Sequence, residues 1–243
     1  MSEMTVETIS YSIVVPVFNA APTLADLHAG LVEHLEPLGA LYEIILVDDC
    51  SSDESWRIIG QLAEKDPRVK GLQLMKNCGQ GAATMAGLAE SGGHLVVTMD
   101  DDLQNPPYEV PALLRFLEEN PGIDAVFGKP RNKQHRYWRR AGSAFINRLS
   151  NAMFAQEAGF KLTSFRAMRR EIVLPLLTLN SNQPPIGALV STLTPRIINI
   201  EVDHSPRAAG TSGYNLRRLL KVSLSKFLGF STMPLRLLAT LGL

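Results

Sequence analysis

The first 130 residues alternate between short apolar runs and longer stretches in which apolar positions recur with a helical period. The apolar runs are rich in Val and Ile and nearly continuous, which is typical of a parallel sheet covered on both faces. They predict strands at 11–18, 42–49, 69–75, 94–100 and 123–129. The stretches between them predict helices at 22–38, 53–65, 80–91 and 108–120. This repetition indicates an α/β fold with a doubly wound, mostly parallel sheet.

Local signals extend this pattern. Ser51 and Glu54 have the spacing of a capping box at the start of the helix at 53–65. Beyond residue 130, further strands are predicted at 160–168 and 195–204, with a helix between them. Ligands of such sheets bind at the carboxyl ends of the strands, so the residues that follow each strand are candidate site residues.

The composition narrows the classes of protein that fit. The chain has 243 residues, of which 45% are hydrophobic and 20% charged, enough for a packed core. Such a composition excludes a disordered chain, a collagen-like repeat and a disulfide scaffold. Cys50 and Cys78 fit no metal-ligand spacing and predict a reducing compartment. The polar N-terminus does not resemble a secretory signal, and no run of 18 apolar residues predicts a membrane span.

The formal net charge of zero conceals a division of charge along the chain. Residues 1–124 contain 20 Asp and Glu and 6 Lys and Arg, a net charge of −14. Residues 125–243 contain 4 acidic and 18 basic residues, a net charge of +14. Solvated surface charge can produce such asymmetry, but so can a protein in which one half binds cations and the other binds anions.

The sequence TMDDDLQNPP at 98–107 is the most informative motif. Three successive aspartates at a strand end repel one another unless a cation or hydrogen-bond donors compensate. If the segment is extended, Asp100 and Asp102 leave the same side and can hold one divalent cation, with Gln104 as a further oxygen ligand. An acidic turn that caps the following helix is the alternative.

Two further motifs follow predicted strands. In VDDCSSDES at 47–55, Asp48 and Asp49 can accept a base N–H or ribose hydroxyls, although at least one of them is expected to brace the loop. In NCGQGAATMAGLA at 77–89, the density of small residues favours close packing of a helix on the sheet over a dinucleotide loop.

Together, VVPVFNA, VDDCSSDES, NCGQGAA and MDDDLQNPP resemble the inverting GT-A glycosyltransferases of family two in order and spacing. The DLQ-x-P-P continuation is similar to the polyprenyl-phosphate branch of that family. The resemblance covers residues 11–235 and implies the GT-A fold of nucleotide-diphospho-sugar transferases. It also implies inverting transfer of a sugar from a nucleotide-diphosphate donor to a polyprenyl phosphate such as undecaprenyl phosphate.

The resemblance assigns residues as well. It implies Mg2+ or Mn2+ held by Asp100, Asp102 and Gln104. It implies donor contacts from Pro16, Phe18, Asn19, Asp48, Asp49, Asp101, Arg140, Ser143 and Ser212. It implies catalytic roles for Asp102 and for the phosphate-binding Arg131 and Arg207. The sequence HSPRAAGTSGY resembles the acceptor loop of the family, with Arg207, Gly210, Ser212 and Tyr214 at the matching positions.

One departure bears on the acceptor. Some relatives carry an acidic residue just before the Phe-Arg pair, but this chain has no carboxylate at 160–164. A sugar hydroxyl needs a positioned base. A phosphate monoester is mostly ionised at neutral pH and needs none. Transfer to a glycan hydroxyl, by another family-two enzyme, and a non-catalytic nucleotide-sugar binding module are the alternatives.

The C-terminal sequence fits a lipid acceptor. Leucines and a phenylalanine share one face of a helix predicted at 216–228, and basic residues lie elsewhere, as in interfacial helices. A core-packing helix has the same period. We expect a catalytic domain at 1–214 and, at 215–243, a basic amphipathic juxtamembrane segment truncated before membrane helices. The expected location is the cytoplasmic face of the inner membrane. A nucleic-acid partner is not expected, and a homo-oligomer is left open.

Overall fold

A computed structural model describes residues 9–131, 160–179 and 185–205. Seven strands form its centre: β1 (Tyr11–Val17), β2 (Tyr42–Asp48), β3 (Val69–Gln73), β4 (Leu95–Thr98), β5 (Ala125–Pro130), β6 (Arg166–Arg169) and β7 (Ile197–Val202). The α-helices are α1 (Leu24–Leu35), α2 (Ser55–Lys65), α3 (Gln80–Glu90), α4 (Val110–Glu119), α6 (Arg170–Leu177) and α7 (Ile186–Leu193). Short 3-10 helices are η1 (Glu36–Leu38) and η2 (Pro107–Glu109).

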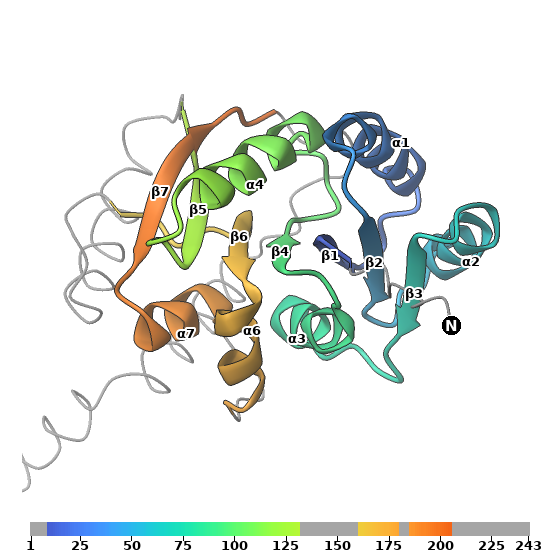
Figure 1. Ribbon diagram of the computed structural model, residues 1–243. Coiled ribbons are helices and arrows are strands. Elements are labelled where there is room, and N and C mark those ends of the chain that lie inside the picture. The colour runs from blue at the N-terminus through green and yellow to red at the C-terminus, as the bar shows by residue number, and fades with distance from the viewer. Residues whose placement is uncertain (1–8, 132–159, 180–184, 206–243) are drawn as a thin grey trace, which may run out of the picture. The chain divides into compact units, whose positions relative to one another are not determined.

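The strands form one sheet in the order β3-β2-β1-β4-β6-β5-β7 (Figure 1). Neighbouring strands are parallel, except that β6 runs antiparallel to both β4 and β5. The chain first adds strands on one side of β1 and then places β4 on its other side. The loops after β1 and β4 therefore flank the point at which the direction of winding reverses, where α/β sheets bind ligands.

Pro16 marks this point within the sheet. The carbonyl of Val14 accepts the N–H of Met99, whereas the carbonyl of Val17 accepts the N–H of Asp49 in the loop after β2. Alternate residues of a parallel strand face opposite neighbours, so Pro16 faces the β4 side. The pairing of β1 with β4 has ended by then, at Val14 and Thr98. A residue without an N–H is tolerated there because no ladder hydrogen bond is lost.

Helices cover both faces of the sheet, as the nearly continuous apolar strands predict (Figure 1). Helices α1, α2 and α4 bury their apolar side chains on one face, and α3, α6 and α7 on the other. Helix α3 lies close to the sheet at Gly87, where an added Cβ would come within 2.4 Å of the side chain of Val14. This contact confirms the packing interpretation of the small residues at 77–89.

All five strands and four helices predicted before residue 130 are present, with ends that differ by a few residues. Of the strand predicted at 160–168, only the end belongs to β6. The capping box is wrong, because α2 begins at Ser55 and its N-cap residue, Glu54, makes no side-chain capping hydrogen bond. The hydroxyl of Ser51 instead accepts the N–H of Asn19 from another loop.

Candidate active site

Asp100 lies just beyond β4, at the carboxyl end of the sheet, and is held by neighbours from two other elements. One carboxylate oxygen accepts a hydrogen bond from the amide of Gln80, at the start of α3. The other accepts the hydroxyl of Ser164, at a distance of 2.6 Å. Burial, with the nearby charge of Asp102, raises the pKa of Asp100 above its usual range. Within the described ranges, both side chains that donate hydrogen bonds to Asp100 are therefore neutral.

The residues after Asp100 form a turn and not the extended segment that the sequence analysis assumes. Leu103 has a φ of 58°, a left-handed conformation that side chains of its size rarely adopt. The carboxylate of Asp102 accepts the N–H of Gln104 at 3.1 Å. The turn thus keeps the negative charges of Asp100 and Asp102 close enough to interact. Their proximity comes from this turn.

Asp101 faces the loop after β1. Its carboxylate accepts the N–H of Phe18 at 3.0 Å, and its carbonyl accepts the hydroxyl of Thr23 at 2.7 Å. Burial raises the pKa of Asp101 to about 6, and the charges of Asp100 and Asp102 act in the same direction. Asp100 and Asp101 are therefore bonded to other segments of the chain, whereas Asp102 accepts a hydrogen bond within its own turn.

A buried arginine lies next to this cluster. Only 6% of Arg166 is exposed, and its Nε donates to the hydroxyl of Thr98 and to the carbonyl of Ser164. Its guanidinium lies 5.7 Å from the centre of the Phe127 ring. Burial lowers the pKa of Arg166 to about 10, and the negative charge of Asp100 opposes this change. Arg166 thus remains a cation beside Asp100 at neutral pH.

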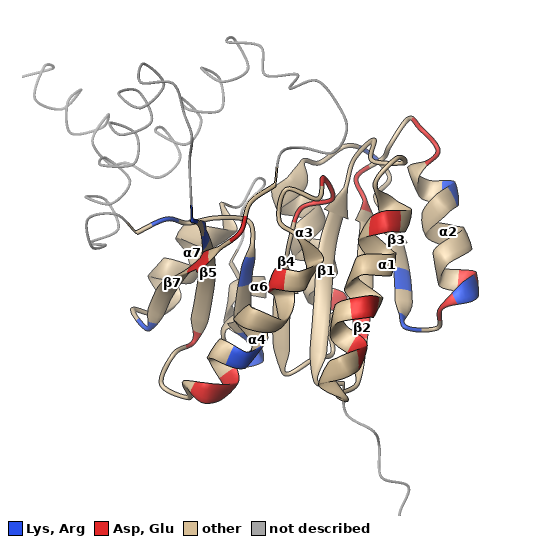
Figure 2. Ribbon diagram, turned by 90° about the horizontal axis from the view of Figure 1, so that it is seen from above, with Lys and Arg blue, Asp and Glu red and all other residues tan. Residues whose placement is uncertain are grey.

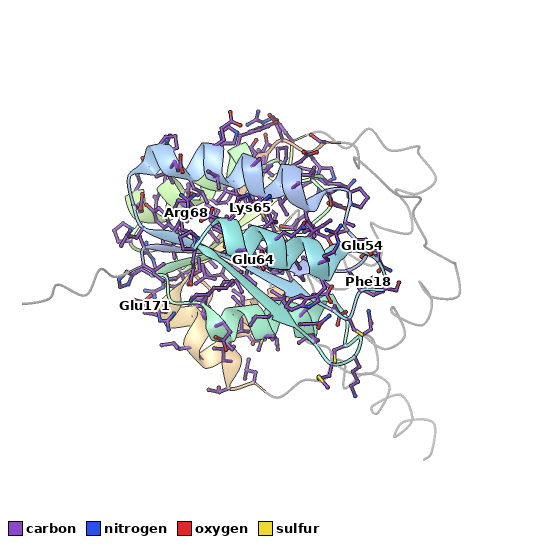
Figure 3. The ribbon with its side chains drawn as sticks, turned by 90° about the vertical axis from the view of Figure 1, so that its right-hand side faces the viewer. Phe18, Glu54, Glu64, Lys65, Arg68 and Glu171 are labelled. Carbon is purple, nitrogen blue, oxygen red and sulfur yellow. The ribbon has the colours of Figure 1, made fainter. Side chains whose placement is uncertain are left out.

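The end of β1 and the loop after it contain three of the predicted donor-binding residues: Pro16 in the strand, and Phe18 and Asn19 in the loop. Phe18 is 48% exposed and lies at the end of the molecule where β1 ends (Figure 3). The side-chain oxygen of Asn19 accepts hydrogen bonds from the N–H and hydroxyl of Ser52. Asn19 also has a φ of 52°, so this loop is strained as well as bonded. It presents an exposed aromatic ring on a fixed backbone.

Asp48, the last residue of β2, and Asp49, which follows it, are both buried. The carboxylate of Asp49 accepts the N–H groups of Cys78 at 2.7 Å and Gly79 at 2.8 Å. Asp48 accepts the N–H of Ser51 and, at 3.3 Å, the amide of Gln73. Asp49 therefore braces the loop before α3, as expected of at least one of the pair. A nucleoside contact by either residue stays a prediction.

Arg131 follows β5 beside the end of β7. Its N–H donates to the carbonyl of Val202 at 2.9 Å, and its guanidinium pairs with Asp203 at 3.2 Å. The N–H of Asp203 donates to the carboxylate of Glu109, and the N–H of Ser205 donates to the carbonyl of Gln104. The segment leading to the predicted acceptor loop is thus joined to the turn that carries the aspartates.

Several predicted residues lie outside the described part of the chain. They are Arg140, Ser143, Arg207, Gly210, Ser212 and Tyr214. The amphipathic segment at 215–243 also lies outside it. Their roles stay predictions.

Sequence reasoning missed three residues that contact or face Asp100: Gln80, Ser164 and Arg166. Gln80 lies inside a motif interpreted only as a packing segment. Ser164 and Arg166 are more than 60 residues from Asp100 in sequence, and β6 reaches the cluster only by pairing antiparallel with β4. No local sequence pattern predicts the pairing of β6 with β4. The pair Phe165-Arg166 enters the sequence analysis only because some relatives have an acidic residue just before it.

Residues 12–176 match a family model that is described as glycosyl transferase family 2. The chain is 36% identical over 232 residues to an undecaprenyl-phosphate 4-deoxy-4-formamido-L-arabinose transferase of Proteus mirabilis, an alignment that covers 95% of this chain and 71% of the relative. A protein of the same description from Klebsiella pneumoniae is also 36% identical, with 95% and 70% covered.

Solved structures share the fold. Glucosyl-3-phosphoglycerate synthase from Mycobacterium tuberculosis, crystallised with Mn2+, UDP and glucosyl-3-phosphoglycerate, superposes with a TM-score of 0.63 at 20% identity, covering 92% of this chain and 81% of that one. Residues 1–349 of TarS from S. aureus superpose with a TM-score of 0.56 at 19% identity, and this chain covers 60% of that fragment. These similarities confirm the GT-A fold class.

The matched segment 12–176 runs from β1 into α6, so it includes β1 to β6 but not β7, and it contains the cluster at Asp100–Asp102. The family model and the relatives at 36% identity agree on the class of enzyme. The chain belongs to glycosyl transferase family 2 and is a glycosyltransferase.

Proposed function

We propose that this protein transfers a sugar, with inversion, from a nucleotide-diphosphate donor to a polyprenyl phosphate such as undecaprenyl phosphate. The observation that carries the proposal is the convergence of the loops after β1 and β4 around Asp100, Asp101 and Asp102. The relatives at 36% identity are named for transfer to undecaprenyl phosphate. Solved relatives contain UDP, which favours a uridine donor for this chain.

The aspartate turn fits a divalent cation, Mg2+ or Mn2+. Asp100 and Asp102 supply hard carboxylate oxygens, and burial with the nearby charge of Asp102 raises the pKa of Asp100 even though the charge of Arg166 acts in the opposite direction. Within the described ranges no three His, Cys, Asp or Glu side chains gather as a metal site, so donor phosphates would complete the ligand shell. Gln104, two residues after Asp102, is the further candidate ligand of the cation. A bound cation would neutralise charge on the departing diphosphate.

The enzyme must also bind a second anion, the acceptor phosphate, close to the donor diphosphate. Arg131 presents an exposed guanidinium at the end of β5, and we assign it, with Arg207, to the acceptor or donor phosphate. An oxygen of the acceptor phosphate forms a bond to the anomeric carbon while the bond from that carbon to the donor diphosphate breaks. The nucleoside diphosphate leaves, and the sugar is inverted.

This reaction does not require the chain to remove a proton from the acceptor. The segment at 160–164 contributes no carboxylate, and its Ser164 donates to Asp100. An ionised phosphate monoester attacks without a base, whereas a glycan hydroxyl needs one. The absence of a carboxylate from this segment therefore favours the phosphate acceptor.

A lipid acceptor places the reaction at a membrane surface. Among the described residues no helix has both the length and the apolarity needed to cross a bilayer. We propose that the basic segment at 215–243 binds anionic headgroups at the cytoplasmic face of the inner membrane.

The test is a transfer assay with the purified protein, UDP-sugars, undecaprenyl phosphate and Mn2+, with the glycolipid detected by mass spectrometry. Asp100→Ala and Asp102→Ala should abolish transfer, and EDTA should do the same. Asp26→Ala, which removes an exposed carboxylate from α1, is the matched control and should leave the rate unchanged. Transfer to a glycan hydroxyl in preference to undecaprenyl phosphate would contradict the proposed acceptor.

A further inference from the structure

The loop after β1 is held in an unusual way. Four consecutive backbone N–H groups, from Phe18 to Ala21, all donate to side-chain oxygens. Three of the acceptors come from the segment before and at the start of α2: Ser51, Ser55 and Asp53. The fourth acceptor, the carboxylate of Asp101, comes from the turn after β4. The loop is therefore fixed from two sides.

Asp101 differs from its two neighbours in what it contacts. Asp100 is bonded to Gln80 and Ser164, and Asp102 caps the N–H of Gln104 within the turn. Asp101 instead reaches across to the loop after β1. A second hydrogen bond, from the hydroxyl of Thr23 to the carbonyl of Asp101, joins the same two segments. Two links thus connect the segment 18–23 to the turn of the aspartates.

We propose that Asp101 is a positioning residue, which fixes the loop carrying Phe18 relative to Asp100 and Asp102, and not a donor ligand as the sequence resemblance implies. The inference rests on the proposed function, in which this loop lies beside the nucleoside and the other two aspartates serve the cation and diphosphate. Asp101 then sets the distance between the two halves of the donor site. Its loss should weaken binding of the nucleoside half and spare binding of the diphosphate half.

Isothermal titration calorimetry with two separate probes tests this division. One probe is uridine 5′-monophosphate, and the other is inorganic pyrophosphate with Mn2+. We expect Asp101→Ala to weaken binding of the monophosphate at least fivefold and to change binding of Mn2+ and pyrophosphate by less than twofold. Asp101→Asn, whose amide oxygen can accept the same N–H, should bind both probes within twofold of the unmodified protein. Asp26→Ala controls for the loss of one negative charge.

Two further measurements keep the test independent of folding defects. Thr23→Val removes the second link without altering the acidic turn, and it should weaken monophosphate binding by about twofold with the same selectivity. Hydrogen exchange should show faster exchange of the Phe18 amide in Asp101→Ala and unchanged exchange in Asp101→Asn. Thermal unfolding identifies any variant that does not fold. If Asp101→Ala does not fold, the binding data for Thr23→Val and Asp101→Asn test the positioning role instead.

Several outcomes would contradict the positioning role of Asp101. Equal loss of both probes in Asp101→Ala would show that Asp101 is itself a cation or diphosphate ligand. Unchanged monophosphate binding would show that the link does not position the loop. If the unmodified protein binds neither probe, the proposed function fails together with this inference. If it binds both and the variants do not discriminate, only the positioning role fails.

Discussion

Buried carboxylates at the two edges of the sheet differ in their partners, although the exposed pair of Arg131 and Asp203 also lies at the edge where the strands end. At the edge where the strands begin, three acidic side chains are ion-paired: Glu43 with Lys70, Asp66 with Arg68, and Asp124 with Arg196. Hydrogen bonds from Arg68 lower the pKa of Asp66 to about 2. The pKa values of Glu43 and Asp124 are also lowered, since hydrogen bonds from their partners outweigh burial.

At the edge where β1 and β4 end, Asp100 and Asp101 have raised pKa values, and their hydrogen-bond donors are an amide, a hydroxyl and a backbone N–H. In Figure 2, red segments lie in loops at this upper edge, with blue segments near β5, β7 and α2, and red and blue segments lie together at the lower edge. Figure 3 shows Phe18 at one end of the described part of the chain and Arg68 toward the other. Carboxylates paired with a cation stabilise the fold, whereas buried carboxylates with raised pKa values, such as Asp100 and Asp101, are typical of functional sites.

The largest expected effect is on catalysis. Replacing Asp100 or Asp102 by Ala should lower the rate of sugar transfer by roughly 100-fold or more, because charge on the departing diphosphate loses its counterion site. The measurement is the initial rate at saturating UDP-sugar and Mn2+. The same substitution at the opposite edge, Asp66→Ala, should leave the rate of the folded protein within about twofold. Comparable loss at both edges would remove the functional distinction between them.

The next effect is on stability. Asp66→Asn should lower the free energy of unfolding by about 2 kcal/mol at pH 7. The folded pKa of Asp66 is below its unfolded value of 3.8, so its contribution is present above pH 4 and is lost as the pH falls through about 2. Urea denaturation at pH 7 and near pH 2 measures this difference. A destabilisation that is as large at pH 2 as at pH 7 would contradict the ion-pair explanation.

Asp101→Asn should change stability in the opposite direction. Without metal, at pH 7, we expect the free energy of unfolding to rise by roughly 1 kcal/mol, because the substitution removes a buried charge close to Asp100 and Asp102. Urea denaturation in EDTA measures this change. If Asp101→Asn and Asp66→Asn both destabilise the protein, then the charge of Asp101 stabilises the fold as that of Asp66 does, and the contrast between the two edges is wrong.

The smallest effect is expected at an exposed ion pair. Arg131 and Asp203 are 3.2 Å apart, and both side chains are about half exposed. Asp203→Asn should therefore change the free energy of unfolding by no more than about 0.5 kcal/mol, and high salt should abolish that change. A much larger loss would mean that this pair, although near the candidate site, stabilises the fold as the pairs of the opposite edge do.

The sequence was a good guide to elements and to the place of the site. Nearly continuous runs such as that at 42–49 predict buried parallel strands, because both faces of the strand are covered. The motif at 98–107 pointed to the carboxyl end of β4, because three aspartates in a row exceed what a helix cap needs. The capping box failed because hydrogen-bond acceptors such as Ser51 can satisfy donors far away in sequence as readily as local ones.

By itself, then, the sequence determined the strand and helix order, the family and the aspartates at the end of β4, because these depend on local periodicity and on motifs of fixed spacing. Only the tertiary structure decided which aspartate contacts what. The pairing of β6 with β4 carries Ser164 and Arg166 toward Asp100, and the return of β4 beside β1 places Asp101 on the N–H of Phe18. Such contacts join residues 60 or more positions apart, and sheet pairing, not spacing along the chain, brings them together.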